Sequence, residues 1–367
     1  MTCAGDEGHS PAAFQGGVTC FQLAAKLQPF QYLTLNRFDK EDTVMKKILA
    51  LILVAMLALS VGAAFAEVAD AANYKVLVGA SNMSGSFYSW LAKSCQAEVE
   101  AMGIKCDIFD FASDDSKVPT MIEQAITGGY TGMILDIPDH DQNIHDLLQE
   151  ALDAGVYTVN VNNADPVDGI CCNIGLDNYT LGKNIGAAAA EMVPEGAKGL
   201  IVKATPGNQG SEDRYNGFID ALAEAGRDDI EILAVQNSKD WSKEGTMTVM
   251  EDWTQIYDDF DFLYAPCDDM CCGAVEVCEA AGYDVQKIMF FGIDGLANGC
   301  YEVQKGTFAA TVLQNANDEA TMAAKVLYEM MSGADTSSRL FALDGTIITL
   351  DNVEDVLAMH EANGMLN

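Results

Sequence analysis

Residues 74–111 read YKVLVGASNMSGSFYSWLAKSCQAEVEAMGIKCDIFDF, and their hydrophobic pattern decides the fold. Short apolar runs at 74–78 and 106–111 have the length of buried strands. Between them, apolar side chains in 87–102 recur at steps of three and four, which predicts a helix with one apolar stripe. A strand, a helix and a second strand in this order predict one unit of a parallel α/β sheet.

The same alternation continues along the chain. The first series of expected strands comprises 74–78, 106–111, 132–135 and 158–161. The second series comprises 200–203, 230–235, 262–265, 287–293 and 309–313, with helices that include 212–225 and 317–331. Two series of this kind predict two consecutive doubly wound α/β domains with parallel sheets. Ligands of such sheets bind at the carboxyl ends of the strands, so the functional residues are expected there.

Composition limits the function. The chain has 367 residues, with 20 Lys and Arg against 55 Asp and Glu, and a formal net charge of −35. The first 66 residues are balanced, with five basic and five acidic side chains, so the acidic excess lies after them. This charge excludes a protein that recognises nucleic acid electrostatically, and it disfavours anionic membrane surfaces.

Residues 45–66 read MKKILALILVAMLALSVGAAFA, which is typical of an export signal with a basic start and an apolar run. Cleavage after Ala66 would start the mature chain at Glu67, and an uncleaved membrane anchor is the alternative. We interpret 1–44 as an upstream extension outside the native chain, with a genuine N-terminal extension as the alternative. The protein is therefore expected to be exported, to the periplasm or the cell surface.

Nine cysteines follow the expected cleavage site, an odd number that cannot all pair. The cluster Cys267–Cys272 suggests an alternative from another class, a thiol enzyme or a metal-binding protein, because thiolates bind soft metals. However, there is no C-x-x-C pair, and Cys271 and Cys272 would point to different sides of a helix. We interpret these residues as buried thiols. His140 and His145, with their acidic neighbours, are interpreted as a solvated helix start rather than a metal site.

The common catalytic and cofactor motifs are absent. The sequence contains no G-x-x-x-x-G-K-[ST], no G-x-G-x-x-G and no G-x-S-x-G. It therefore lacks the local signatures of phosphate loops, dinucleotide sites and hydrolase nucleophile elbows. We expect no cofactor and no metal, and we predict a binding protein rather than an enzyme.

Polar and aromatic side chains gather after the expected strands. Amides and carboxylates at successive strand ends, with an arginine and bulky rings, suit a polyol: rings cover its C–H faces and polar groups bond its hydroxyls. These positions are Ser81, Phe87, Tyr88, Asn162, Asn163, Arg214, Trp241, Cys267, Asp294 and Gln314. Each has a simpler explanation as a helix cap, a turn, a solvated side chain or a core ring. Their joint placement favours a ligand site.

At these positions the chain resembles the periplasmic sugar-binding proteins of ABC importers, in particular the ribose-type group, over about 74–350. The most specific segments are Ser81–Tyr88, Asp177-Asn178, Arg214–Phe218, Asp268–Ala274 and Phe291–Gly295. The resemblance implies a type I periplasmic binding protein fold, with two lobes joined by three crossings near Leu176, Gln314 and Gly345. It implies an N-terminal lobe of 67–176 plus 315–345, and a C-terminal lobe of 177–314 plus 346–367.

The resemblance also implies roles for the ten site positions. The aromatic ones would sandwich a sugar ring, and the arginine, carboxylate and amide ones would bond its hydroxyls as the lobes close around a small neutral sugar or polyol. The family has a basic residue at the position of Asn163 and an amide at that of Cys267. Another pentose, a hexose, an inositol or a furanosyl signal molecule therefore fits as well as ribose. The implied partner is an ABC permease, and the alternative is a chemoreceptor or sensor.

Overall fold

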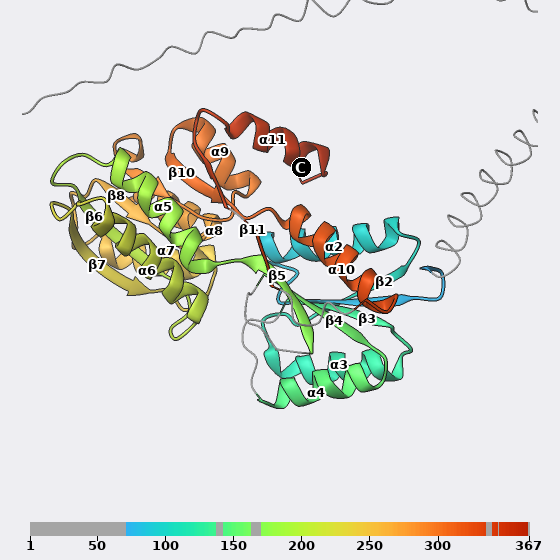
Figure 1. Ribbon diagram of the computed structural model, residues 1–367. Coiled ribbons are helices and arrows are strands. Elements are labelled where there is room, and N and C mark those ends of the chain that lie inside the picture. Colours follow the sequence, from blue (N-terminus) through green and yellow to red (C-terminus); the bar gives the residue numbers. More distant parts are fainter. Residues whose placement is uncertain (1–70, 137–141, 163–169, 335–339, 344, 366–367) are drawn as a thin grey trace, which may run out of the picture. The chain divides into compact units, whose positions relative to one another are not determined.

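The structure, a computed structural model, describes residues 71–136, 142–162, 170–334, 340–343 and 345–365 (Figure 1). The expected export signal, the upstream extension, His140 and Asn163 lie outside the described residues. Within the described ranges, no helix is both long enough and apolar enough to cross a bilayer.

The first sheet has the strand order β11-β5-β4-β3-β1-β2, and all of its neighbouring strands are parallel. Its strands are β1 (Lys75–Ala80), β2 (Lys105–Asp110), β3 (Gly132–Leu135), β4 (Tyr157–Asn162), β5 (Cys171–Leu176) and β11 (Leu340–Leu343). Its helices are α2 (Ser86–Ala101), α3 (Val118–Thr127), α4 (Gln142–Asp153) and α10 (Ala316–Met331), and a 3-10 turn spans Asp115–Lys117.

Both faces of the first sheet are covered. In β1, Val76 and Val78 pack into the core formed with α2 and α10, whereas Leu77 packs into the core formed with α3 and α4. Successive strand side chains point to opposite faces, so a continuous apolar run buries both. Figure 1 shows the two helix pairs on opposite sides of this sheet.

The second sheet has the order β12-β10-β9-β8-β6-β7, and it is parallel except for the antiparallel pair β10–β12. Its strands are β6 (Lys198–Lys203), β7 (Glu231–Asn237), β8 (Phe262–Tyr264), β9 (Met289–Phe291), β10 (Phe308–Leu313) and β12 (Thr346–Ile348). Its helices are α5 (Asn178–Met192), α6 (Gln209–Glu224), α7 (Lys243–Trp253), α8 (Asp268–Ala281), α9 (Ala297–Lys305) and α11 (Val353–Ala362), with a 3-10 turn at Val285–Lys287.

The chain passes between the two sheets three times, after β5, after β10 and after β11. The predicted fold class, α/β with two parallel-sheet lobes and three crossings, is confirmed. The strands β5, β11 and β12 were not among the expected ones. Helix α6 begins three residues earlier than expected, because the Asn208 side chain accepts a hydrogen bond from the amide of Ser211 and caps the first turn.

Candidate functional site

Arg214 is placed by the close packing of α5 against α6. A Cβ atom at Gly182 of α5 would come within 1.9 Å of the Arg214 carbonyl oxygen, and one at Gly217 of α6 would come within 2.1 Å of the Tyr179 carbonyl oxygen. Only glycine permits this approach of the two backbones. The Arg214 side chain is consequently buried, with 6% of the residue exposed.

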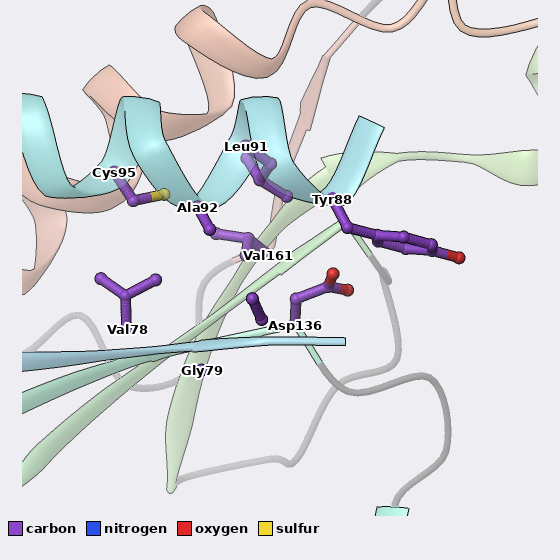
Figure 2. Close-up of a pocket in the computed structure, with 9 residues that line it drawn as sticks. Val78, Gly79, Tyr88, Leu91, Ala92, Cys95, Asp136 and Val161 are labelled. Atoms are coloured by element: carbon purple, nitrogen blue, oxygen red, sulfur yellow. The ribbon is translucent and has the colours of Figure 1, made fainter. Parts of the chain in front are cut away.

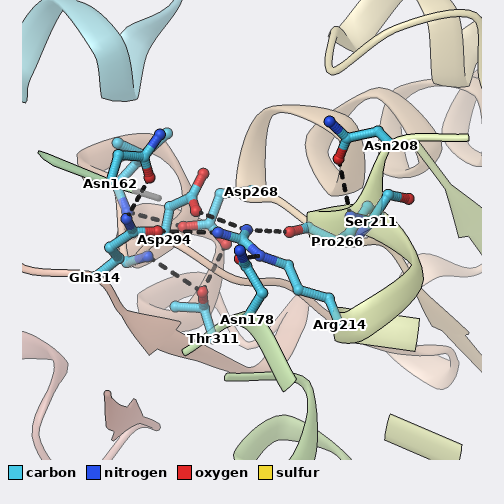
Figure 3. Close-up of polar contacts among 12 residues, drawn as sticks. Asn162, Asn178, Asn208, Ser211, Arg214, Pro266, Asp268, Asp294, Thr311 and Gln314 are labelled. Carbon is cyan, nitrogen blue, oxygen red and sulfur yellow. Dashed lines mark hydrogen bonds and ion pairs between the residues drawn. The ribbon is translucent and has the colours of Figure 1, made fainter. Parts of the chain in front are cut away.

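The guanidinium of Arg214 joins four segments of the chain (Figure 3). Its Nε donates to Asn178 Oδ1 at 2.8 Å, and its Nη1 donates to the Pro266 carbonyl at 2.6 Å. Nη1 also lies 3.2 Å from Asp294 Oδ1, and Nη2 donates to Gln314 Oε1 at 3.0 Å. The rigid fork of donors in arginine suits it to fix several acceptors at once.

Trp241 and Cys267 lie at the same end of the second sheet. The guanidinium carbon of Arg214 is 5.2 Å from the ring centroid of Trp241, within the range of a cation–π contact. Cys267 precedes α8 and is buried, and this burial raises the pKa of its thiol well above the usual range. The thiol is therefore neutral at pH 7.

Asp294 is held in an unusual backbone conformation, with φ of 110°. Its carbonyl accepts a hydrogen bond from the amide of Gln314 at 3.0 Å. Beneath this loop, the buried carboxylate of Asp268 accepts from the amide of Leu296 at 2.8 Å and from Thr311 Oγ1 at 2.6 Å. These bonds stabilise the loop that directs the Asp294 side chain toward Arg214, and α9 has no side-chain cap, so Asp294 does not serve as one.

Gln314 links this cluster to the first sheet. Its Nε2 donates to Asn162 Oδ1 at 2.8 Å, and Asn162 Nδ2 donates to Asp136 Oδ1 at 3.0 Å. Asn162 has φ of 67°, a left-handed conformation that asparagine tolerates better than most residues. We call the continuous set Asp136, Asn162, Gln314, Arg214 and Asp294 the Arg214 network.

Two buried acids of this site were missed in the sequence. Asp136 directly follows β3 and is 3% exposed, and burial raises its pKa to about 6. Glu319 of α10 is fully buried, its Oε1 accepts from Gln314 Nε2 at 3.4 Å, and burial raises its pKa to about 8. The position of Asp136 at a strand end could have identified it. No comparable signal marks a glutamate inside a helix.

The remaining predicted residues of the first sheet lie near Asp136. The Ser81 hydroxyl donates to the Asp136 carbonyl at 2.7 Å. Tyr88 and Asp136 line one small pocket (Figure 2), which has no room for a water molecule in this structure. Phe87 is not brought to the network: it is buried in the core, edge-on to Trp90 at 6.3 Å between ring centroids.

The cysteine cluster has an apolar setting. Cys271 is fully buried, and its Sγ lies 3.5 Å from the carbonyl oxygen of Phe291. Burial raises the pKa of the Cys271 thiol well above its usual range, which keeps it protonated. Among the residues that the structure describes, no group of three or more His, Cys, Asp or Glu side chains could hold a metal ion.

The sequence of this chain is similar to that of known binding proteins. Residues 76–335 match a family described as the periplasmic binding protein domain. The chain is 24% identical over 260 residues to the ribose import binding protein of Bacillus subtilis, covering 71% of this chain and 82% of that one. It is 25% identical over 284 residues to the D-allose-binding periplasmic protein of Escherichia coli, covering 75% and 88%.

A solved structure is similar over a comparable length. The myo-inositol binding protein of Caulobacter, bound to myo-inositol, superposes with a TM-score of 0.71 at 23% identity, covering 79% of this chain and 97% of that one. A likeness at this level of identity establishes the shared fold.

Proposed function

The chain belongs to the periplasmic binding protein family, and from this premise we propose that it captures a monosaccharide or similar small polyol and delivers it to an ABC permease. The observation that carries the proposal is the Arg214 network, which presents directed donors and acceptors at the strand ends of both sheets. The ribose-binding and allose-binding relatives support the ligand class.

Ligand hydroxyls would bond to groups that the fold already holds in place. Arginine has five N–H donors, and the four contacts of Arg214 within the described part of the chain leave one N–H for a ligand. The ring of Trp241, held against Arg214, would cover a C–H face of the sugar. The proposed contacts are completed by Ser81, Tyr88, Asn162, Asn163, Cys267, Asp294 and Gln314.

The two sheets would act as two lobes. We assign 67–176 plus 315–345 to one and 177–314 plus 346–367 to the other. Periplasmic binding proteins are themselves an established example of hinge closure around a ligand. Here the three crossings between the sheets would bend, and Gln314 lies in one of them. Closure would remove water from the network and thereby strengthen its hydrogen bonds to the ligand.

Export is part of the same proposal. We assign 45–66 as a cleaved signal, which would place the binding protein outside the cytoplasm with its permease. A chemoreceptor or sensor that read the same liganded form would use the same site.

A thermal-shift screen tests the ligand class. The purified protein would be heated with individual pentoses, hexoses, inositols, other polyols and nucleosides. A ligand that binds the native state raises the melting temperature by mass action, by an amount equivalent to about 2.7 kcal/mol at one hundred times Kd. We expect at least one sugar or polyol to do so, and no response to any of them would contradict the proposal.

Two variants then test the site by calorimetry with the responding compound. Trp241→Ala removes the stacking ring, and Asp294→Ala removes the carboxylate, so both should weaken binding strongly. Asp355→Asn is a matched control, since Asp355 is exposed on α11. Unchanged affinity in both site variants would refute the assignment.

A further inference from the structure

Asp136 is the part of the Arg214 network whose buried carboxylate lacks a full set of partners among the described residues. Asp136 is 3% exposed, its Oδ1 accepts a hydrogen bond from Asn162, and hydrogen bonding with Ser81 also favours its ionised form. The other oxygen, Oδ2, is buried and has no partner among the described residues. Burying an ionised carboxylate without a cation or full hydrogen bonding is costly. Such a group at a ligand site indicates that the ligand supplies the missing partner.

Asp136 has no ion-pair partner among the described residues. Arg214 is already paired with Asp294 at 3.2 Å. None of the ion pairs within the described ranges involves Asp136 or Glu319. At pH 7 Glu319 is mostly protonated, because burial raises its pKa to about 8, whereas Asp136, whose pKa is raised to about 6, is mostly ionised. Burial also raises the pKa of Asp294 to about 7 in spite of Arg214, so Asp294 is only partly ionised at pH 7 and Asp136 is the most fully ionised carboxylate of the network.

The sequence segments that follow β3 and β4 contain no lysine or arginine that could pair with Asp136. Residues 137–141, which follow β3, and residues 163–169, which follow β4, contain neither residue type in their sequence. His140 is the one residue of these two segments that can carry a positive charge, and otherwise the cation arrives with the ligand.

The surroundings of Asp136 suit an ammonium group. Tyr88 lines the same pocket, and Figure 2 shows the carboxylate of Asp136 and the ring of Tyr88 at the same end of it. A carboxylate gives an ammonium a charge-assisted hydrogen bond, and an aromatic face attracts it through the ring quadrupole. The rest of the pocket wall is largely apolar, with Val78 and Leu91 near the thiol of Cys95, so Asp136 is the one carboxylate among the residues that line the pocket.

We propose that the ligand is an amino sugar or an aminocyclitol, whose ammonium bonds Asp136 Oδ2 beside Tyr88 while its hydroxyls bond the Arg214 side of the network. This inference rests on the proposed function and narrows its ligand class. It replaces the neutral ligand expected from the sequence, because Asp136 was not among the predicted site residues. The pocket has no room for a water molecule in this structure, so the proposal requires the ring of Tyr88 to move when the ligand enters.

The test compares compounds that differ only by an amine in place of a hydroxyl. D-glucosamine and D-glucose, D-galactosamine and D-galactose, and an aminodeoxy-inositol and its parent inositol would be titrated into the full chain by calorimetry at pH 7. A charge-assisted bond is roughly twice as strong as a neutral one, so the amine of at least one pair should bind about tenfold tighter or better. Asp136→Asn should abolish that preference, and Asp355→Asn should keep it.

The outcomes separate the inference from the proposed function. If the hydroxyl members bind as tightly as the amines, or the preference survives in Asp136→Asn, the chain binds polyols but the amine inference is wrong. If no member of the panel and no compound of the thermal-shift screen binds, the proposed function fails and the inference fails with it. Far-ultraviolet circular dichroism and the melting temperature would show that Asp136→Asn is folded.

Discussion

Two buried carboxylates occupy comparable places in the two sheets, and they differ in their partners. Asp294 follows β9 of the second sheet and is 6% exposed, and the guanidinium of Arg214 lies 3.2 Å from it. Asp136 follows β3 of the first sheet and is 3% exposed. Its Oδ1 accepts a hydrogen bond from the side-chain amide of Asn162, which is neutral, and not from a cation.

This difference indicates that the part of the site on the second sheet has its polar partners without a ligand, whereas the part on the first sheet does not. Asp294 and Arg214 satisfy each other and are held by Asp268, Asn178 and Gln314, so this half is preorganised. The carboxylate of Asp136 retains an unpartnered oxygen. The second sheet would therefore provide the rigid half of the site, and the first sheet the half that the ligand completes.

The largest effect is expected from Arg214→Met. This change removes the cation and leaves Asp294 buried and unpaired, which costs about 3 to 5 kcal/mol when one partner of a buried ion pair is lost. Urea unfolding at pH 7 would measure the loss. The double variant Arg214→Met/Asp294→Asn should recover part of it, and a loss below about 1 kcal/mol in the single variant would contradict the comparison.

The two carboxylates should respond in opposite ways to the same isosteric change. Asp294→Asn leaves the Arg214 charge unpaired and should lower the free energy of unfolding by on the order of 2 kcal/mol. Asp136→Asn removes a buried charge that has no cation, so at pH 8 without ligand it should leave the stability unchanged or increase it. Urea midpoints of both variants at pH 8 check this, and equal destabilisation by the two changes would break the comparison.

Glu319 predicts a dependence of stability on pH. Its pKa is raised from 4.5 to about 8, so the native protein retains a proton that the unfolded chain releases. Because the native state then binds more protons, the free energy of unfolding falls as pH rises from about 4.5 to about 8. Asp136 adds a fall of the same sign between about 4 and its pKa of about 6.

Glu319→Gln should flatten the upper part of that curve. The amide keeps a neutral side chain at every pH, so the variant should exceed the original chain in stability at pH 8.5 and differ less from it at pH 5. Chemical denaturation at several pH values would measure this. A decline between pH 6.5 and pH 8 that remains as steep in the variant would contradict the assigned ionisation.

The smallest effect is expected at an exposed ion pair between the same two helices. Lys183 Nζ of α5 lies 2.8 Å from Glu224 Oε1 of α6, and both side chains are largely in contact with solvent. Water screens such pairs, so Lys183→Met should leave the urea midpoint unchanged within error. A loss approaching that of Arg214→Met would show that burial does not explain the difference between the two cations.

Much of the architecture was predictable because strand spacing and helical periodicity are local properties of the sequence. The site was predictable in part, since Arg214, Asp294 and Gln314 follow strands whose ends meet in a parallel sheet. Asp136 obeys the same rule and was overlooked. Glu319 lies inside a helix, where only tertiary packing reveals that a polar side chain is buried.

Tertiary packing also determines which of two adjacent aromatic residues is buried in the core. Adjacent aromatic rings at the start of a helix cannot both face the sheet, yet the sequence does not say which one turns inward. The structure places Phe87 in the core and Tyr88 beside Asp136. Phe87 packs edge-on against Trp90, whereas Tyr88 faces a pocket lined by Gly79 and Ala80 of β1, and no local pattern encodes this packing.

The most direct measurement is a crystal structure of the protein with the tightest-binding compound of the thermal-shift screen. The account predicts that the ligand contacts Arg214, Asp294 and Gln314 from the second sheet and its crossing, and Asn162 and Asp136 from the first. Electron density for the ligand at another place, with the Arg214 network unchanged and out of contact with it, would contradict the assignment of this network as the binding site.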